Sequence, residues 1–71
     1  MSKYEIADKM IEYAIFNWRY QFYECEREEA RDELTSEDGL NQFIENLNED
    51  LSNDARREDA TELLNLVNTI R

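Results

Sequence analysis

Rows of carboxylates at helical spacing are the feature of this 71-residue chain whose residue types could do chemistry. Side chains four positions apart lie on one face of an α-helix, about 6 Å apart along its axis. Like charges at this spacing repel each other weakly, so stability alone does not favour them. The acids that repeat in this way are Glu24, Glu28 and Asp32, then Glu45 and Glu49, then Asp50 and Asp54, and finally Glu58 and Glu62.

The negative charge is concentrated in the middle of the chain. There are 18 acidic and 8 basic residues, which give a net charge of −10. Residues 1–23 and 60–71 are each neutral overall, so the whole excess lies in residues 24–59. Such an excess costs stability through self-repulsion. It also opposes binding to nucleic acids or anionic membranes, which favour Lys and Arg. We therefore expect neither a nucleic acid nor a membrane as a direct ligand.

Three interpretations of the acidic block remain open. Helices that carry such rows could present a field similar to that of DNA, whose phosphates repeat about every 3.4 Å along each strand, to a basic groove of another protein. Alternatively, the acids form only the solvated face of an acidic domain, or they bind a partner of another kind. Under the first interpretation the candidate partner-binding residues are Glu24, Glu28, Asp32, Glu45, Glu49, Asp50, Asp54 and Glu58.

The residue types of common catalytic and metal sites are missing or isolated. The chain has no His, which removes the usual general base and nearly every common zinc arrangement. Cys25 is the only cysteine, and on an apolar helix face it is expected to be a small core residue rather than a nucleophile. The stretch after Asp50 has Ala55 and Thr61 where a calcium-binding loop needs glycine and glutamate. We expect no enzymatic activity, no cofactor and no metal.

The elements that must position the acids are expected to be helices. The chain has no Pro and a single glycine, Gly39, so turns built on these residues are almost absent. Ser2, Ser36 and Ser52 stand where helices would begin, since serine favours the N-cap position. Apolar residues recur at three- and four-residue steps after Ser36 and again after Asn53. These patterns predict one all-α domain, residues 1–71, folded as a small three-helix bundle with helices at about 3–33, 36–51 and 54–70.

The stretch YAIFNWRYQFYE, from Tyr13 to Glu24, is unusually rich in aromatic residues for an acidic chain. Phe16, Trp18 and Tyr20 alternate with polar residues, which is typical of a strand. The chain offers no second strand to pair with it, so we expect this stretch to continue the first helix.

On a helical wheel this first helix has two apolar faces. The face expected to pack in the core carries Tyr4, Ala7, Ile11, Ala14, Ile15, Trp18, Phe22 and Cys25. The opposite face carries Ile6, Tyr13, Phe16, Tyr20 and Tyr23. Two alternatives remain for this second face. Either the two shorter helices straddle the first and cover both faces, or Tyr13, Phe16, Tyr20 and Tyr23 form an interface with a partner or a second copy.

These features favour a protein that works by binding. The expected function is an inhibitor that mimics nucleic acid and blocks a basic DNA- or RNA-binding surface of a host protein. In size, charge and helix content the chain is similar to phage-encoded proteins that antagonise bacterial defence, such as anti-restriction and anti-CRISPR proteins. The alternative is a helical homodimer or adaptor, structural or regulatory, whose acidity serves solubility.

A cytoplasmic location is expected, the host cytoplasm if the chain is phage-encoded. The first residues, MSKYEIADKM, lack the unbroken apolar run of a signal peptide. A single cysteine suits a reducing compartment.

Overall fold

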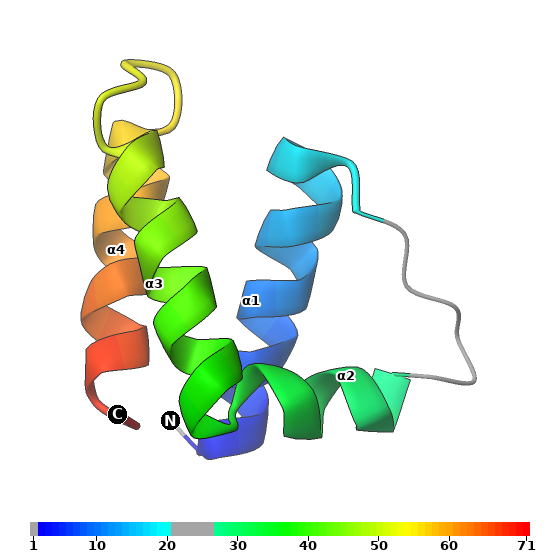
Figure 1. Cartoon of the computed structure of the whole chain (residues 1–71). Coiled ribbons are helices and arrows are strands. Elements are labelled where there is room, and N and C mark those ends of the chain that lie inside the picture. The colour runs from blue at the N-terminus through cyan, green and yellow to red at the C-terminus, as the bar shows by residue number, and fades with distance from the viewer. Residues whose placement is uncertain (1, 21–26) are drawn as a thin grey trace.

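Four helices make up the parts of the chain that the computed structural model describes, residues 2–20 and 27–71 (Figure 1). They are α1 (Lys3–Trp18), α2 (Arg27–Leu34), α3 (Glu37–Asp50) and α4 (Arg57–Asn68). No strand occurs in these residues, so the expected all-α class is confirmed. The number of helices differs from the expected three, because α1 and α2 take the place of one long first helix.

The first helix ends at Trp18 rather than continuing to residue 33. Arg19 adopts a left-handed conformation, with a φ of 54°. The backbone N–H groups of Arg19 and Tyr20 both donate to the carbonyl of Ala14, which closes the end of the helix. A left-handed residue other than glycine costs roughly 1–2 kcal/mol. Contacts of the Trp18 side chain with α3 offset this cost. No local signal in the sequence predicts these contacts.

Two of the three expected serine caps are present. The Ser2 hydroxyl accepts a hydrogen bond from the N–H of Glu5 at the start of α1. The Ser36 hydroxyl accepts one from the N–H of Gly39 at the start of α3. Each cap satisfies a backbone donor that would otherwise lack a partner in the first turn. The positions where α1 and α3 begin are therefore confirmed.

The expected cap at Ser52 is wrong. Its hydroxyl donates instead to the carbonyl of Glu49 and so closes the end of α3. The chain then turns at Asn53, whose side-chain oxygen accepts from the N–H of Ala55. The helix α4 begins only at Arg57 and has no side-chain cap. The expected break between the last two helices is present. It is longer than predicted, because α4 begins at Arg57 and not at about residue 54.

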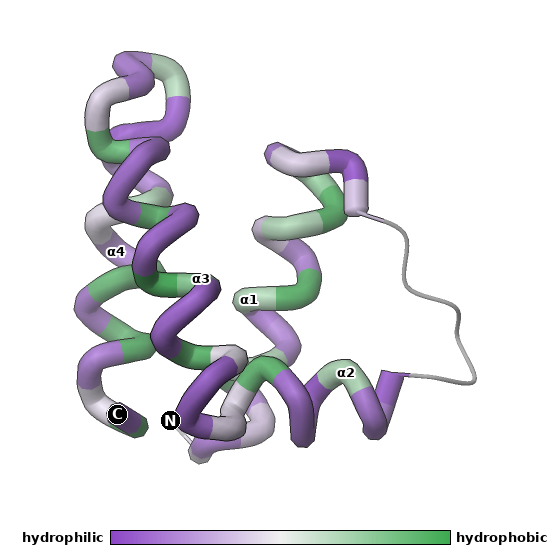
Figure 2. Tube along the Cα trace, viewed as in Figure 1, coloured by the Kyte–Doolittle hydropathy of each residue, from purple (hydrophilic) through white to green (hydrophobic). Residues whose placement is uncertain are grey.

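The helices α3 and α4 run side by side in opposite directions, and α1 packs against α4 (Figure 1). The short helix α2 crosses one end of the molecule and touches both α1 and α3. Figure 2 shows apolar positions recurring along α1, α3 and α4. The core that these helices enclose consists of Ile6, Met10, Tyr13, Ala14, Leu40, Phe43, Leu47, Ala60, Leu63 and Val67.

The buried face of α1 differs from the expected one by a rotation of somewhat less than a quarter turn. Ile6 and Tyr13, assigned to the outer face, are buried. Tyr4 and Ile15, assigned to the core, are exposed. The wheel gives two apolar faces but does not show where the neighbouring helices dock, and in the structure Ile6, Met10 and Tyr13 are buried together with Ile11. Tyr13 is thus a core residue and not part of an exposed aromatic interface.

Candidate functional site

The exposed carboxylates of α2, α3 and α4 form the candidate site. Glu45 and Glu49 are exposed on α3, and Glu28 and Asp32 are exposed on α2. The remaining exposed candidates are Asp54, in the turn between α3 and α4, and Glu58, in the first turn of α4. Glu24 and Tyr23, which were also predicted as site residues, lie outside the described residues.

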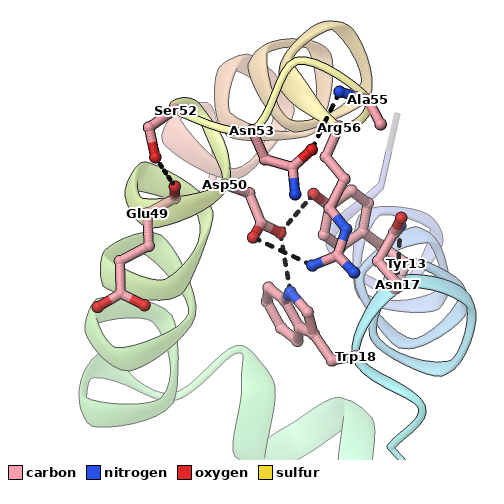
Figure 3. Close-up of polar contacts among 9 residues, drawn as sticks. All are labelled: Tyr13, Asn17, Trp18, Glu49, Asp50, Ser52, Asn53, Ala55 and Arg56. Atoms are coloured by element: carbon pink, nitrogen blue, oxygen red, sulfur yellow. Dashed lines mark hydrogen bonds and ion pairs between the residues drawn. The ribbon is translucent and has the colours of Figure 1, made fainter.

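Asp50 is an exception to the expected acidic surface, because its side chain is buried. Its Oδ2 atom accepts hydrogen bonds from the Tyr13 hydroxyl at 2.7 Å and from the Trp18 indole N–H at 2.8 Å (Figure 3). Its Oδ1 atom lies 3.4 Å from Nη1 of Arg56. The assignment of Asp50 to the partner-binding surface is therefore wrong. This carboxylate satisfies inward-facing donors and joins the end of α1 to the α3–α4 turn.

Aromatic rings surround this buried carboxylate. The rings of Tyr13 and Trp18 meet edge to face, with centroids 5.3 Å apart. Trp18 also packs against Phe43 of α3, at 4.9 Å. Edge-to-face pairs of this kind are worth about 0.5–1.5 kcal/mol beyond the area that they bury. We refer to Tyr13, Trp18, Asp50 and Arg56 as the Asp50 clamp, because they hold α1 against the hairpin of α3 and α4.

The clamp changes the acidity of its tyrosine. Burial raises the pKa of Tyr13 well above its ordinary value, and the hydrogen bond to the Asp50 carboxylate raises it further. Both causes oppose the charged phenolate, because it would be poorly solvated and would lie beside another negative charge. Tyr13 therefore acts as a fixed hydrogen-bond donor and not as an acid at neutral pH.

Alkaline pH is expected to unfold the protein through Tyr13. Since the folded-state pKa is raised, the stabilisation is fully present below the ordinary pKa of about 10 and is lost as pH rises toward the folded-state value. The measurement is an alkaline titration followed by tyrosinate absorbance and circular dichroism, with Tyr13→Phe as the reference for subtraction. The Tyr13 signal should appear only as helical signal is lost. Ionisation at the ordinary pKa, with the helices intact, would contradict the prediction.

A second aspartate joins α1 to α2. Asp8 accepts from Arg31 through both carboxylate oxygens, at 2.8 Å and 3.2 Å, and Arg27 lies 3.5 Å away. The hydrogen bond from Arg31 lowers the pKa of Asp8, and the same contact raises the pKa of Arg31. Two-point pairing of this kind fixes orientation as well as distance. The arginines at positions 27 and 31 therefore neutralise Asp8 and not the acids on their own helix.

All four ion pairs in residues 2–20 and 27–71 join an arginine to an aspartate. Besides the pairs of Asp8 and Asp50, Arg57 binds Asp54 in the α3–α4 turn. No glutamate in these ranges forms an ion pair. Four of the eight basic residues thus form ion pairs with aspartates. Two of these aspartates, Asp8 and Asp50, join one helix to another. The exposed glutamates of these ranges therefore lack an ion-pair partner.

The position of each glutamate along its helix separates a structural role from a possible functional one. Glu28 and Glu58 lie in the first turns of α2 and α4, where the helix dipole favours negative charge. Glu49 lies at the opposite end of α3, where the dipole disfavours it, and Glu45 lies one turn before it. Neither cap nor dipole accounts for the Glu45–Glu49 row, so this row is the strongest candidate for a binding surface.

The sequence did not predict the roles of Asp8 and Asp50, the two aspartates that organise the structure: Asp8 was not singled out, and Asp50 was assigned to the acidic surface. One signal was available for Asp50. A buried Tyr or Trp needs an acceptor for its polar hydrogen. The aromatic residues at the end of α1 therefore indicated that a carboxylate or carbonyl elsewhere in the chain accepts hydrogen bonds from them. The signal did not indicate which of the acids would serve. Asp8 had no comparable signal, because its partners lie on another helix.

The described residues provide few other sites. They contain no group of three or more Cys, Asp and Glu side chains arranged to hold a metal ion. None of the helices in these ranges is long and apolar enough to cross a membrane. Phe16 and Tyr20, two members of the predicted aromatic interface, are exposed over 83% and 60% of their surface.

The chain was compared with protein-family models, curated proteins and solved structures. None of the three comparisons found a significant match.

Proposed function

We propose that the protein is a non-enzymatic inhibitor that mimics nucleic acid and occupies the basic DNA- or RNA-binding surface of another protein. One observation supports the proposal most strongly. The arginines of the described ion pairs all contact aspartates, which leaves the Glu45–Glu49 row on α3 exposed and without a counter-charge. Three of these four arginines contact Asp8 or Asp50, the two aspartates that join helices, and not the outer face.

The physical effect of this arrangement is a strong negative field on a fixed body. A net charge of −10 on 71 residues attracts a basic surface over a distance limited by salt screening. The Asp50 clamp and the Asp8 pairs hold the helices in place, so little freedom is lost when the acids meet cationic partners. A basic groove that normally holds phosphates would be the complementary surface.

The setting that this function implies is the cytoplasm of a cell in which a nucleic-acid-binding protein must be blocked. An inhibitor of a bacterial defence enzyme, encoded by a phage, fits the size and charge of the chain. Mimicry predicts that DNA or RNA competes with the protein for its partner. It also predicts that rising salt weakens the complex steeply, since each exposed ion pair is screened.

Charge reversal on α3 tests the proposal. The immobilised protein is used to capture partners from the native host's lysate, with and without excess double-stranded DNA as competitor, and the captured proteins are identified by mass spectrometry. We expect nucleic-acid-binding proteins that DNA displaces. The double variant Glu45→Lys, Glu49→Lys should bind them about tenfold more weakly or worse, which corresponds to a loss of at least about 1.4 kcal/mol.

The matched control is the double variant Glu29→Lys, Glu33→Lys. This pair has the same spacing, the same change in charge and an exposed position on α2. Binding should decrease much less than in the α3 variant. Equal losses in the two variants would mean that overall charge alone attracts the partner. Retained binding in the α3 variant, or capture that DNA does not affect, would remove the case for mimicry.

A further inference from the structure

A second surface, distinct from the Glu45–Glu49 row, lies between α1 and α4. It is a groove of about 580 Å³ whose lining residues come from these two helices. Its apolar part consists of Ile15 and Phe16 on α1 together with Leu63 and Leu66 on α4. Phe16 is the most exposed large apolar residue in the described ranges, at 83%, and Ile15 beside it is exposed over 45%. Adjacent exposed apolar side chains beside a groove are typical of a surface that meets another molecule.

The rim of the groove is charged, and its charges have mostly one sign. Glu12 on α1 and Asp59 and Glu62 on α4 contribute three carboxylates, whereas Lys9 is the only base in the lining. None of these three acids forms an ion pair in residues 2–20 or 27–71. The groove therefore combines an apolar centre with a negative rim.

We propose that this groove binds a basic amphipathic helix of a partner protein. Apolar side chains on one face of that helix would cover Phe16 and Ile15. Its Lys and Arg side chains would then lie against Glu12, Asp59 and Glu62. Amphipathic helices bind to grooves in this way by placing apolar anchors at positions i, i+3, i+4 and i+7.

Charge decides between this occupant and a second copy of the chain. In a symmetric dimer the same surface of both copies meets itself. The three carboxylates of one rim would then face three more, with only two lysines between them, and each copy carries a net charge of −10. A basic helix replaces that repulsion with attraction. The sign of the rim thus favours a cationic partner.

The groove lies on a different part of the surface from the Glu45–Glu49 row. The helix α3, which carries Glu45 and Glu49, contributes no residue to the lining of this groove. The two surfaces can be tested independently. They could also bind two parts of one partner, in which case the total affinity would exceed that of either site.

The probe is a fluorescent synthetic peptide of Leu and Lys, with leucines placed at positions i, i+3, i+4 and i+7 to give a helical apolar face. The comparison peptide has the same composition in an order that gives no apolar face. Binding is measured by fluorescence anisotropy at physiological salt. We expect the amphipathic peptide to bind at least about tenfold more tightly than the scrambled one, because only it can place anchors in the groove. Equal binding of the two would mean attraction by charge alone and would overturn the proposal.

Variants of the protein locate the binding. Phe16→Ala should weaken binding of the amphipathic peptide several-fold while circular dichroism shows intact helices, since the ring is mostly exposed. Phe16→Leu should retain most of the affinity. Glu62→Lys should weaken binding, and the Glu45→Lys, Glu49→Lys variant should bind the peptide nearly as well as the original chain. If the α3 variant no longer captured nucleic-acid-binding proteins but still bound the peptide, the two surfaces would be shown to bind independently.

Two further results would overturn the proposal. One is unchanged peptide binding by Phe16→Ala. The other is sedimentation of the original chain as a dimer that Phe16→Ala converts to a monomer, since the groove would then be occupied by a second copy. Both measurements use the full chain.

Discussion

Replacement of Asp50 by alanine is expected to lower the free energy of unfolding by about 2–4 kcal/mol. The change removes the acceptor of the Tyr13 hydroxyl and of the Trp18 indole N–H. A buried donor without a partner costs about 1–3 kcal/mol, and the lower end applies to Trp18 because it is only partly buried. Arg56 can turn toward water and adds little. Against a total stability of about 5–15 kcal/mol, a loss of this size is large for a small domain.

Urea unfolding followed by circular dichroism measures the effect. Asp54→Ala is the matched control, since it removes the same side chain four residues later, where the carboxylate is exposed and pairs with Arg57 at the surface. Its cost should be within about 0.5 kcal/mol. The variant Asp50→Asn should fall between the two, because its amide oxygen can still accept. Equal losses for Asp50→Ala and Asp54→Ala would contradict the structural role assigned to the clamp.

The same pair of aspartates shows what a sequence can reveal about the candidate site. Asp50 and Asp54 are equivalent in the sequence pattern, being acids four positions apart in an acidic block. In the structure one is buried and the other is exposed. Asp50 differs from Asp54 in burial because Tyr13 and Trp18 of α1 contact it. Such long-range contacts produce no periodic pattern in the sequence. The exposed positions of Glu45 and Glu49, by contrast, follow from helix period alone.

The fold was predictable to a similar extent. The starts of α1 and α3 follow from Ser2 and Ser36, because capping is a local interaction. The end of α1 was not predictable from local signals, since Arg19 takes a left-handed conformation without the glycine that usually accompanies it. The bond from Trp18 to Asp50 fixes that end, and the two residues are 32 positions apart. Local chemistry therefore predicted the two starts that a serine caps, but neither the end of α1 nor the uncapped start of α4.

The second large effect on stability is expected for substitution of Gly39. Whether alanine there raises or lowers the free energy of unfolding depends on a contact that the sequence does not show. It lies in the first turns of α3, where alanine would favour the helix by about 1 kcal/mol. Its φ is not positive, so an L-residue would not be strained by the backbone conformation itself. A Cβ atom at this position would, however, overlap the carbonyl oxygen of Glu33 and lie 2.9 Å from its carbonyl carbon. Both atoms belong to backbone and cannot rotate away.

We expect Gly39→Ala to lower the free energy of unfolding by about 1–3 kcal/mol, the usual cost of forcing extra atoms into a packed site. The Glu33 carbonyl also accepts from the Ser36 hydroxyl, at 2.6 Å, and from its N–H, at 3.2 Å. Making room for a methyl group would disturb both bonds and, with them, the cap of α3. The steric cost therefore exceeds the gain in helix propensity.

Urea unfolding of Gly39→Ala, compared with Asn41→Ala, distinguishes the two effects. Asn41 is exposed two positions later on α3, so alanine there should be neutral or stabilising by a few tenths of a kcal/mol, through propensity alone. Hydrogen exchange should show faster opening at the α2–α3 junction in Gly39→Ala. If Gly39→Ala instead stabilised the protein by about 1 kcal/mol, propensity would dominate. The close approach of the two helices at Glu33 would then not be a constraint on residue 39.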